Sequence, residues 1–139
     1  MKFIVRDTDY AIRALVYMAK AFKKNKQKMV TVDEIVKEEG LPERFLRRLL
    51  QKLAKKGIVK SFKGKAGGFS FSILPSKIKL TDIITIFQGR VDLTSCFLKG
   101  SICPDIKRCA LKKKLGKLTE TLNKELEKIT ISSLLYRRI

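Results

Sequence analysis

The first part of the chain has the apolar periodicity of an amphipathic helix. One helix face is formed by residues at intervals of 4, 3 and 4, namely Ala11, Leu15, Met18 and Phe22. We therefore predict a helix over residues 8–22, with Asp7 or Thr8 capping its first turn. The polar run Lys23–Lys28 ends this helix, and Met29-Val30 follows as a very short strand.

The next segment has the pattern of a helix-turn-helix. Thr31 and Glu34 are spaced as a capping box, so a short second helix starts there and stops at Gly40. Pro42 opens a third helix, because proline fits the first helical position without losing a needed donor. Gly57 ends this helix, where a left-handed residue is favoured. The apolar face of the third helix consists of Phe45, Leu46, Leu49, Leu50 and Leu53.

A β-hairpin with a basic tip follows the third helix directly. Residues 58–63 and 69–74 contain alternating apolar positions, and the glycine-rich tip 64–68 separates them. The glycines do not have the spacing of a phosphate-binding P-loop. A helix-turn-helix followed by such a hairpin is a winged helix.

The C-terminal part predicts a short helix, a loop and a long helix. Thr81 caps a helix over 82–88 that Gly89 ends, and a loop covers 90–104. A long helix then runs from about residue 105 to 128, and the short apolar tail 130–135 docks as a final turn. The long helix has an apolar seam close to an a/d pattern, formed by Leu111, Leu115, Leu118, Leu122, Leu126 and Ile129. This seam packs either on its own domain or, as we prefer, on a second copy in a two-fold dimer.

These elements define a mainly α fold with a small β-hairpin wing, of the α+β class. We divide the chain into a winged helix-turn-helix DNA-binding domain (1–89), a cysteine-bearing sensor loop (90–109) and a dimerisation helix with its tail (105–139).

The charge of the chain points to a polyanionic partner. The 139 residues include 32 Lys and Arg against 13 Asp and Glu, for a formal net charge of +19, and no histidine. Such a charge favours nucleic acid or an anionic membrane surface. The missing histidine excludes His-based catalysis and Cys2His2 zinc fingers, so we do not expect an enzyme. No apolar run approaches the ~20 residues of a membrane span, and no secretory signal is present, so we expect a cytoplasmic protein with reduced or metal-bound cysteines.

The predicted third helix and wing carry the candidate DNA-binding residues. The face opposite the core presents Arg44, Arg47, Arg48, Gln51, Lys52 and Lys55. Arginine near the start of such a helix can bind guanine O6 and N7, whereas lysines further along contact phosphates. The wing adds Lys60, Lys63 and Lys65, which we expect along the DNA backbone or in the minor groove.

Three cysteines form the second candidate site. Cys96, Cys103 and Cys109 have the spacing Cys-x6-Cys-x5-Cys. They could be buried thiols or one disulfide plus a spare thiol, but the loop and the compartment argue against both. Neighbouring cations favour thiolates, which bind metal. Because no histidine or fourth cysteine completes a zinc site, an iron–sulfur cluster is the better interpretation.

The order of these motifs resembles the IscR/NsrR/RirA group of winged-helix transcription regulators with iron–sulfur clusters. The matching residues are Thr8–Leu15, Phe45–Leu53 with Lys56–Val59, Ser61–Phe69, Ile78–Ile83 and the three cysteines. The resemblance implies a homodimer whose long helices cross at the interface, with a cluster held near it by Cys96, Cys103 and Cys109.

Two positions differ from the pattern of this group. The first cysteine gap has six residues instead of the usual five, and Lys112 stands where one branch has a histidine ligand. Another branch uses an aspartate from the first helix of the partner subunit, and Asp9 occupies that motif position. Asp9 is therefore either a cluster ligand, which favours [4Fe–4S] over [2Fe–2S], or a plain N-terminal cap.

We expect, in sum, a dimeric transcription regulator, for instance a repressor, that binds a palindromic operator under control of the cluster and senses nitric oxide, iron or redox state. We expect that the cluster can be lost during aerobic preparation. The alternatives are a regulator of the same group with a thiol or zinc switch, and a basic RNA-binding protein. The latter lacks the aromatic platforms that stack on single-stranded bases.

Overall fold

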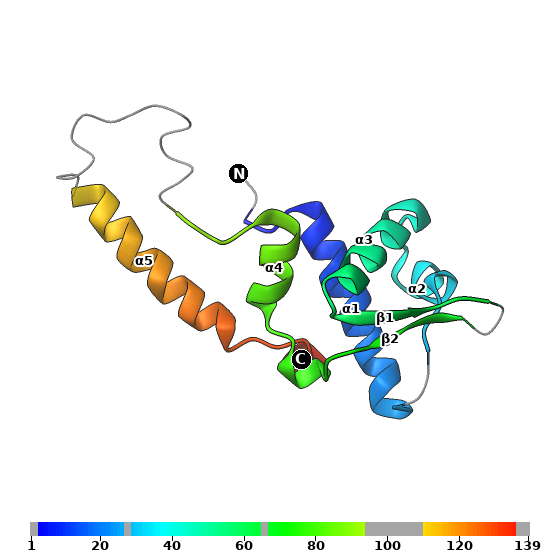
Figure 1. The fold of residues 1–139 in the computed structure, drawn as a ribbon. Coiled ribbons are helices and arrows are strands. Elements are labelled where there is room, and N and C mark those ends of the chain that lie inside the picture. Colours follow the sequence, from blue (N-terminus) through cyan, green and yellow to red (C-terminus); the bar gives the residue numbers. More distant parts are fainter. Residues whose placement is uncertain (1–2, 27–28, 65–66, 94–109, 136–139) are drawn as a thin grey trace.

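The computed structural model describes residues 3–26, 29–64, 67–93 and 110–135. In this part of the chain the order of elements is that of a winged helix followed by a long helix (Figure 1). The helices are α1 (Arg6–Lys24), α2 (Val32–Glu39), α3 (Glu43–Lys55), α4 (Leu80–Gln88) and α5 (Ala110–Glu127). The strands are β1 (Val59–Phe62) and β2 (Gly68–Phe71), and two short 3₁₀ helices are η1 (Pro75–Lys77) and η3 (Ser132–Leu135). The predicted mainly α fold with a small β wing is confirmed.

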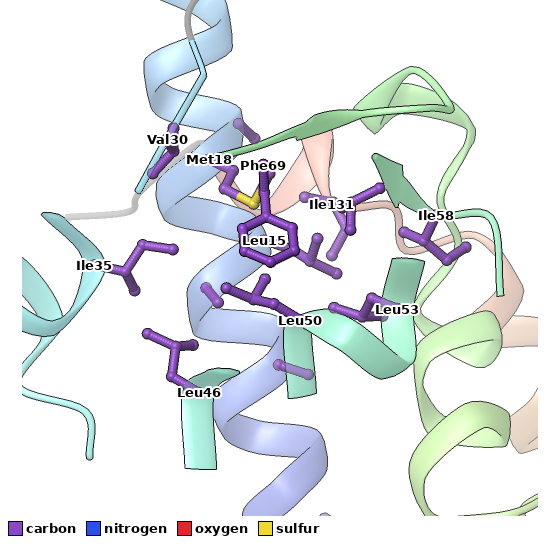
Figure 2. Packing of buried hydrophobic residues seen from close by; sticks show 14 of the residues in the cluster. Leu15, Met18, Val30, Ile35, Leu46, Leu50, Leu53, Ile58, Phe69 and Ile131 are labelled. Atoms are coloured by element: carbon purple, nitrogen blue, oxygen red, sulfur yellow. The ribbon is translucent and has the colours of Figure 1, made fainter. Parts of the chain in front are cut away.

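The core lies where α1, α2, α3 and the hairpin meet (Figure 2). Leu15 of α1, Leu50 of α3 and Ile35 of α2 are completely buried. Phe69 of β2 closes the cluster from the side of the wing. Burying such apolar side chains contributes about 1.5–3 kcal/mol each, so this cluster is what holds the recognition elements together.

Except at the start of α3, the caps of the two helices in the helix-turn-helix have the backbone geometry that the sequence predicts. Thr31 Oγ1 accepts a hydrogen bond from the Glu34 N–H at 3.2 Å, and Gly40 ends α2 with φ of +66°. Gly57 (φ +80°) follows α3, and the Ile58 N–H donates to the Leu53 carbonyl at 3.0 Å. This is a Schellman motif, which turns the chain directly from α3 into β1. Pro42 is the N-cap of α3 and not its first helical residue, because its ψ of 125° is extended.

The wing is a two-stranded antiparallel sheet in the predicted position. Val59 pairs with Phe71, and Phe62 pairs with Gly68. Val30 forms a single bridge to Phe69, with both backbone N–H···O distances below 3.0 Å. The predicted short strand at Met29-Val30 is therefore reduced to this one bridge, which ties the segment before α2 to the base of the wing.

Two helix starts differ from the sequence prediction. α1 begins at Arg6 after Val5, and neither Asp7 nor Thr8 caps it, because both lie inside its first turn. α4 begins at Leu80, so Thr81 does not cap it either. The Asp82 carboxylate instead accepts a hydrogen bond from the Lys79 N–H at 3.0 Å. Lys79 is fixed there by a β-bridge to Thr130, a partner that local sequence does not reveal.

The C-terminal turn is part of the winged-helix core. Ile131 is completely buried, and its N–H donates to the Ile78 carbonyl at 3.0 Å. η3 packs on α1 and η1, which confirms the predicted docking of residues 130–135. α5 packs on α4, and Figure 1 shows it starting far from the wing and running back toward the core. The predicted start of the long helix near residue 105 lies outside the described residues.

Candidate nucleic-acid interface

Helix α3 separates its apolar and cationic residues onto opposite faces. Leu46, Leu49, Leu50 and Leu53 are at most 2% exposed. Phe45, which the sequence assigned to the buried face, is only partly buried. The predicted DNA-binding residues of α3 are all exposed, namely Arg44, Arg47, Arg48, Gln51, Lys52 and Lys55. The buried leucines therefore fix α3 on the protein core, and its opposite face presents the cationic side chains to solvent.

One part of this face opens toward the wing. Arg47 and Gln51 of α3 line a hollow of about 340 Å³ together with Thr31 at the start of α2 and Lys63 of the wing. The hollow brings together the three elements that winged helices use on DNA. Phe62 also lines it and is 45% exposed. Neither Thr31 nor Phe62 was predicted for this surface, although an apolar residue at a basic wing was a usable signal.

The other part of the face is held toward α1 and α4. Arg48 Nη2 lies 3.5 Å from Asp7 Oδ2 in an ion pair. The guanidinium carbons of Arg48 and Arg6 lie 5.0 and 4.7 Å from the centre of the Phe45 ring. Lys52 Nζ lies 5.3 Å from the centre of the Phe87 ring of α4. Arg48 and Lys52 are thus held toward α1 and α4, whereas Arg47 and Gln51 line the hollow beside the wing.

Arg47 makes a different ionic contact. Glu43 Oε1 accepts hydrogen bonds from Arg47 Nε at 3.0 Å and from Arg47 Nη2 at 2.7 Å. Glu43 stands one turn before Arg47 and is the only acidic residue in the sequence of α3. Glu43 was not among the predicted site residues, although its i,i+4 spacing to an arginine was a usable signal.

The wing carries exposed lysines, and glycines shape its tip. Lys60 and Lys63 are exposed, whereas Lys65 lies outside the described residues. The tip closes through a hydrogen bond from the Gly67 N–H to the Gly64 carbonyl at 2.9 Å, and Gly64 has φ of +98°. A Cβ atom at Gly67 would overlap the Phe62 carbonyl oxygen. Glycine at position 67 is thus required by the close approach of two backbone segments.

Three of the acidic residues of α2 act on Tyr17 of α1, and they lie outside the lining of the hollow. Burial raises the pKa of Tyr17 from its ordinary value, and the carboxylates of Glu34, Glu38 and Glu39 raise it further. None of these three glutamates lines the hollow beside Arg47. Their negative charge therefore acts on the pKa of Tyr17. Among the residues that line the hollow, the acidic one is Asp33.

The second candidate site is only partly within the described residues. Cys96, Cys103 and Cys109 lie outside them. Asp9 is the fourth residue of α1, and its carboxylate Oδ2 lies 3.2 Å from Arg13 Nε. The alternative prediction that Asp9 is a plain N-terminal cap is wrong, because the N-cap of α1 is Val5. The Asp9 side chain is 43% exposed, so it is accessible from outside its own domain. Among residues 3–26, 29–64, 67–93 and 110–135, no three potential ligands gather as a metal site.

The apolar seam of α5 is unevenly covered in one protomer. Leu126 is 7% exposed, whereas Leu111 and Leu118 are 47% and 55% exposed. α5 packs on α4, and Asn123 Nδ2 of α5 donates to the carbonyl of Val91, which follows α4, at 3.1 Å. In the described part of the chain, no helix is both long and apolar enough to cross a membrane.

Comparison with known proteins identifies the family. The sequence model described as "Rrf2: Iron-dependent Transcriptional regulator" matches residues 4–137. Protein aau3 of Rhizobium meliloti is 31% identical over 136 residues, which cover 97% of this chain and 86% of that protein. The structure of CymR, the global cysteine regulator of B. subtilis, has a TM-score of 0.79 at 22% identity and covers 97% of both chains. T. potens IscR has a TM-score of 0.73 at 26% identity, covering 97% of this chain and 86% of that one. The predicted resemblance is confirmed, and so is the expectation that the chain is not an enzyme. The chain belongs to the Rrf2 family of transcriptional regulators.

Proposed function

We propose that this regulator binds a palindromic DNA operator through α3 and the wing. The contacts would come from Arg44, Arg47, Arg48, Gln51, Lys52, Lys63 and Lys65. The observation that carries this proposal is the hollow in which Arg47 and Gln51 of α3 face Thr31 of α2 and Lys63 of the wing. A protein that acts on DNA in this way would work in the cytoplasm.

The regulator acts as a homodimer through α5. This part of the proposal is supported by Leu111 and Leu118, which one protomer leaves about half exposed on a helix of 18 residues. A two-fold dimer would bury this seam and would place two copies of α3 on two half-sites of a palindrome. A monomer would leave both leucines in water at a cost of about 25 cal/mol per Å² of apolar surface.

Operator affinity is controlled by an iron–sulfur cluster, with [4Fe–4S] preferred. Cys96, Cys103 and Cys109 would hold the cluster as thiolates, and Asp9 of the partner subunit would supply a carboxylate. The donor chemistry fits, since thiolates are the usual cluster ligands and Asp9 is exposed and held by a surface ion pair. The family description as iron-dependent also supports it. When bound, the cluster supplies a centre that reacts with oxidants or nitric oxide.

The cysteine segment connects α4 to α5, so its conformation bears on both the winged helix and the dimer helix. Loss or oxidation of the cluster that the cysteines hold would alter operator affinity by changing the distance between the two copies of α3. This requires that the two states differ in their affinity for DNA.

A thiol switch without a cluster is the second candidate function. The fold shared with CymR, for which an oxidized form from Staphylococcus aureus has been solved, favours it. In that case the same three cysteines would respond to oxidation by forming a disulfide or a sulfenic acid. Iron and sulfide analysis separates the two candidates.

The test is to purify the protein under argon and compare it with a C96A/C103A/C109A variant. We expect about stoichiometric iron and sulfide and a visible absorption band for the natural protein, and neither for the variant. Binding to a duplex selected from a random pool should depend on the cluster and fall steeply with salt, with a slope of about −0.9 per neutralised phosphate. A colourless natural protein whose DNA affinity equals that of the variant would contradict the cluster. An affinity for duplex DNA that does not change with salt, or a preference for RNA over duplex DNA, would contradict the proposed operator binding.

A further inference from the structure

We infer that Glu43 is a positioning residue that holds Arg47 for reading guanine in the DNA major groove. The inference rests on the proposed DNA-binding function and names the residue that sets its base preference. It starts from the paired hydrogen bonds between one Glu43 oxygen and the Nε and Nη2 atoms of Arg47.

The contact occupies one edge of the guanidinium and leaves another edge available. Arginine has five N–H donors in a planar fork. Nε–H and one Nη2–H form the side-on edge, and both donate to Glu43 Oε1. One Nη1–H and the second Nη2–H remain side by side and form the end-on edge. An end-on pair of N–H groups matches the O6 and N7 acceptors of guanine.

Arg47 lies at the surface that we propose for DNA binding. Arg47 lines the hollow between α2, α3 and the wing, together with Gln51 and Lys63. The adjacent Arg48 has its guanidinium at Asp7 and over the Phe45 ring, on the side of α1. Of these two neighbouring arginines, Arg47 is therefore the one that a carboxylate of its own helix fixes next to the wing.

The competing explanation is an ordinary exposed ion pair. Glu43 and Arg47 side chains are 52% and 54% exposed, and i,i+4 pairs of this kind contribute only about 0.3–0.5 kcal/mol to helix stability. Under that explanation Glu43 is simply a negative charge close to DNA phosphates. Its removal should then strengthen binding to every sequence, because repulsion is lost.

The positioning role predicts the opposite sign for the preferred sequence. Without Glu43 the Arg47 side chain regains its rotamer freedom, and the base contact loses its fixed geometry. We expect E43A to bind the duplex selected by the natural protein about tenfold more weakly, within the 1–3 kcal/mol that a bidentate base contact contributes. E43Q keeps a neutral acceptor and should fall between E43A and the natural protein.

The experiment measures fluorescence anisotropy on the selected duplex and on duplexes with each guanine of a half-site replaced in turn. E125A is the matched control, because Glu125 of α5 pairs at 3.0 Å with Lys128, which directly follows the helix, and its loss changes net charge equally. R47K tests the fork geometry, since lysine keeps the charge without the bidentate edge. Thermal unfolding of each variant checks that the fold is intact.

Support for the inference is weaker binding by E43A at the selected duplex, loss of preference at one guanine, and the same lost preference in R47K, while E125A retains both. The inference is overturned if E43A binds the selected duplex as tightly as E125A does, or more tightly, with unchanged base preference. If the natural protein selects no duplex at all, the proposed function itself fails and this inference with it.

Discussion

Asp7 of α1 and Arg48 of α3 form an ion pair across 41 positions of the chain, with 3.5 Å between Oδ2 and Nη2. The pair joins the start of the first helix to the recognition helix. It also keeps one of the predicted DNA-binding arginines oriented toward the protein.

Replacing Asp7 should release Arg48 for phosphate contacts. We expect D7N to bind non-specific duplex DNA about two- to fivefold more tightly at low salt, because one interface carboxylate is neutralised and one cation is freed. Stability should fall by less than about 1 kcal/mol, as for other exposed pairs. Anisotropy titrations at two salt concentrations measure the first effect. Weaker non-specific binding by D7N would show that the ion pair positions Arg48 productively.

The buried hydroxyl of Thr8 predicts a stabilising substitution. Thr8 is completely buried, and its Oγ1 has no hydrogen-bond partner within the described residues. Valine has the same shape without the hydroxyl, so T8V removes a desolvation cost of about 1–3 kcal/mol without leaving a partner unsatisfied. We expect urea unfolding of T8V to shift to a higher midpoint with an unchanged slope. T8S keeps the hydroxyl and loses a methyl group, so it should be less stable than the natural protein. A lower midpoint for T8V would mean that the hydroxyl has a partner in solution.

The side chain of Gln88 should contribute to stability through both ends of its amide. Its Oε1 accepts from the Val5 N–H at 3.1 Å, and its Nε2 donates to the Phe3 carbonyl at 2.9 Å. Q88E keeps the acceptor and loses the donor, and Q88A loses both. Since a hydrogen bond contributes about 0.5–1.5 kcal/mol, we expect a graded loss of unfolding free energy, larger for Q88A. Q51A is the comparison, because Gln51 makes no side-chain hydrogen bond within the described residues and should unfold almost as the natural protein does. Equal stability of all three variants would contradict this assignment.

Gly67 should be required for the shape of the wing. In G67A the new methyl group overlaps the Phe62 carbonyl oxygen and approaches the Gly64 carbonyl oxygen to 2.8 Å. Relieving this overlap must open the tip, at a cost of about 1–3 kcal/mol, and displace Lys63 from the DNA surface. We expect lower stability together with weaker DNA binding. G116A serves as the counterpart, since a Cβ there meets nothing within 4 Å and gains helix propensity in α5. A G67A protein that binds DNA normally would argue against a role of the wing tip.

Leu118 should report on the proposed dimer. At 55% exposure its replacement by lysine removes little from the core of one protomer. If α5 packs against a second copy, L118K places two charges in an apolar seam, and sedimentation should show a folded monomer. L126A is the contrasting variant, because Leu126 is buried within the protomer and its truncation should lower stability by about 2–5 kcal/mol. A natural protein that sediments as a monomer would contradict the dimer directly.

The sequence predicted elements well where local periodicity decides them. The apolar spacing of Ala11, Leu15 and Met18 indicated α1, and the Gly40 and Gly57 turns were placed correctly because each needs a left-handed residue. It failed at the starts of α1 and α4. There the backbone groups are satisfied by Gln88 and by the bridge to Thr130, which are distant in sequence.

In the candidate interface, too, local spacing predicted some features, whereas partners distant in sequence decided others. The cationic residues of α3 could be selected from their spacing opposite the leucines. Their separation into two groups could not, because it depends on Asp7 of α1 and Phe87 of α4. Phe45 was assigned to the core from its position, yet it serves as a platform for two guanidinium groups. Partners on other helices decide such side-chain orientations, and periodicity contains no information about them.

The burial of Ile131 constrains the order in which the protein can be completed during synthesis. Residues of α1 and Ile78 pack with a side chain that the ribosome adds more than fifty positions after Ile78. While the wing and α5 are being translated, this part of the core is open and its apolar surface faces water. The winged helix can reach its final packing only after residue 131 has left the ribosome, so a translational stall within α5 would leave a nascent chain vulnerable to proteolysis and aggregation.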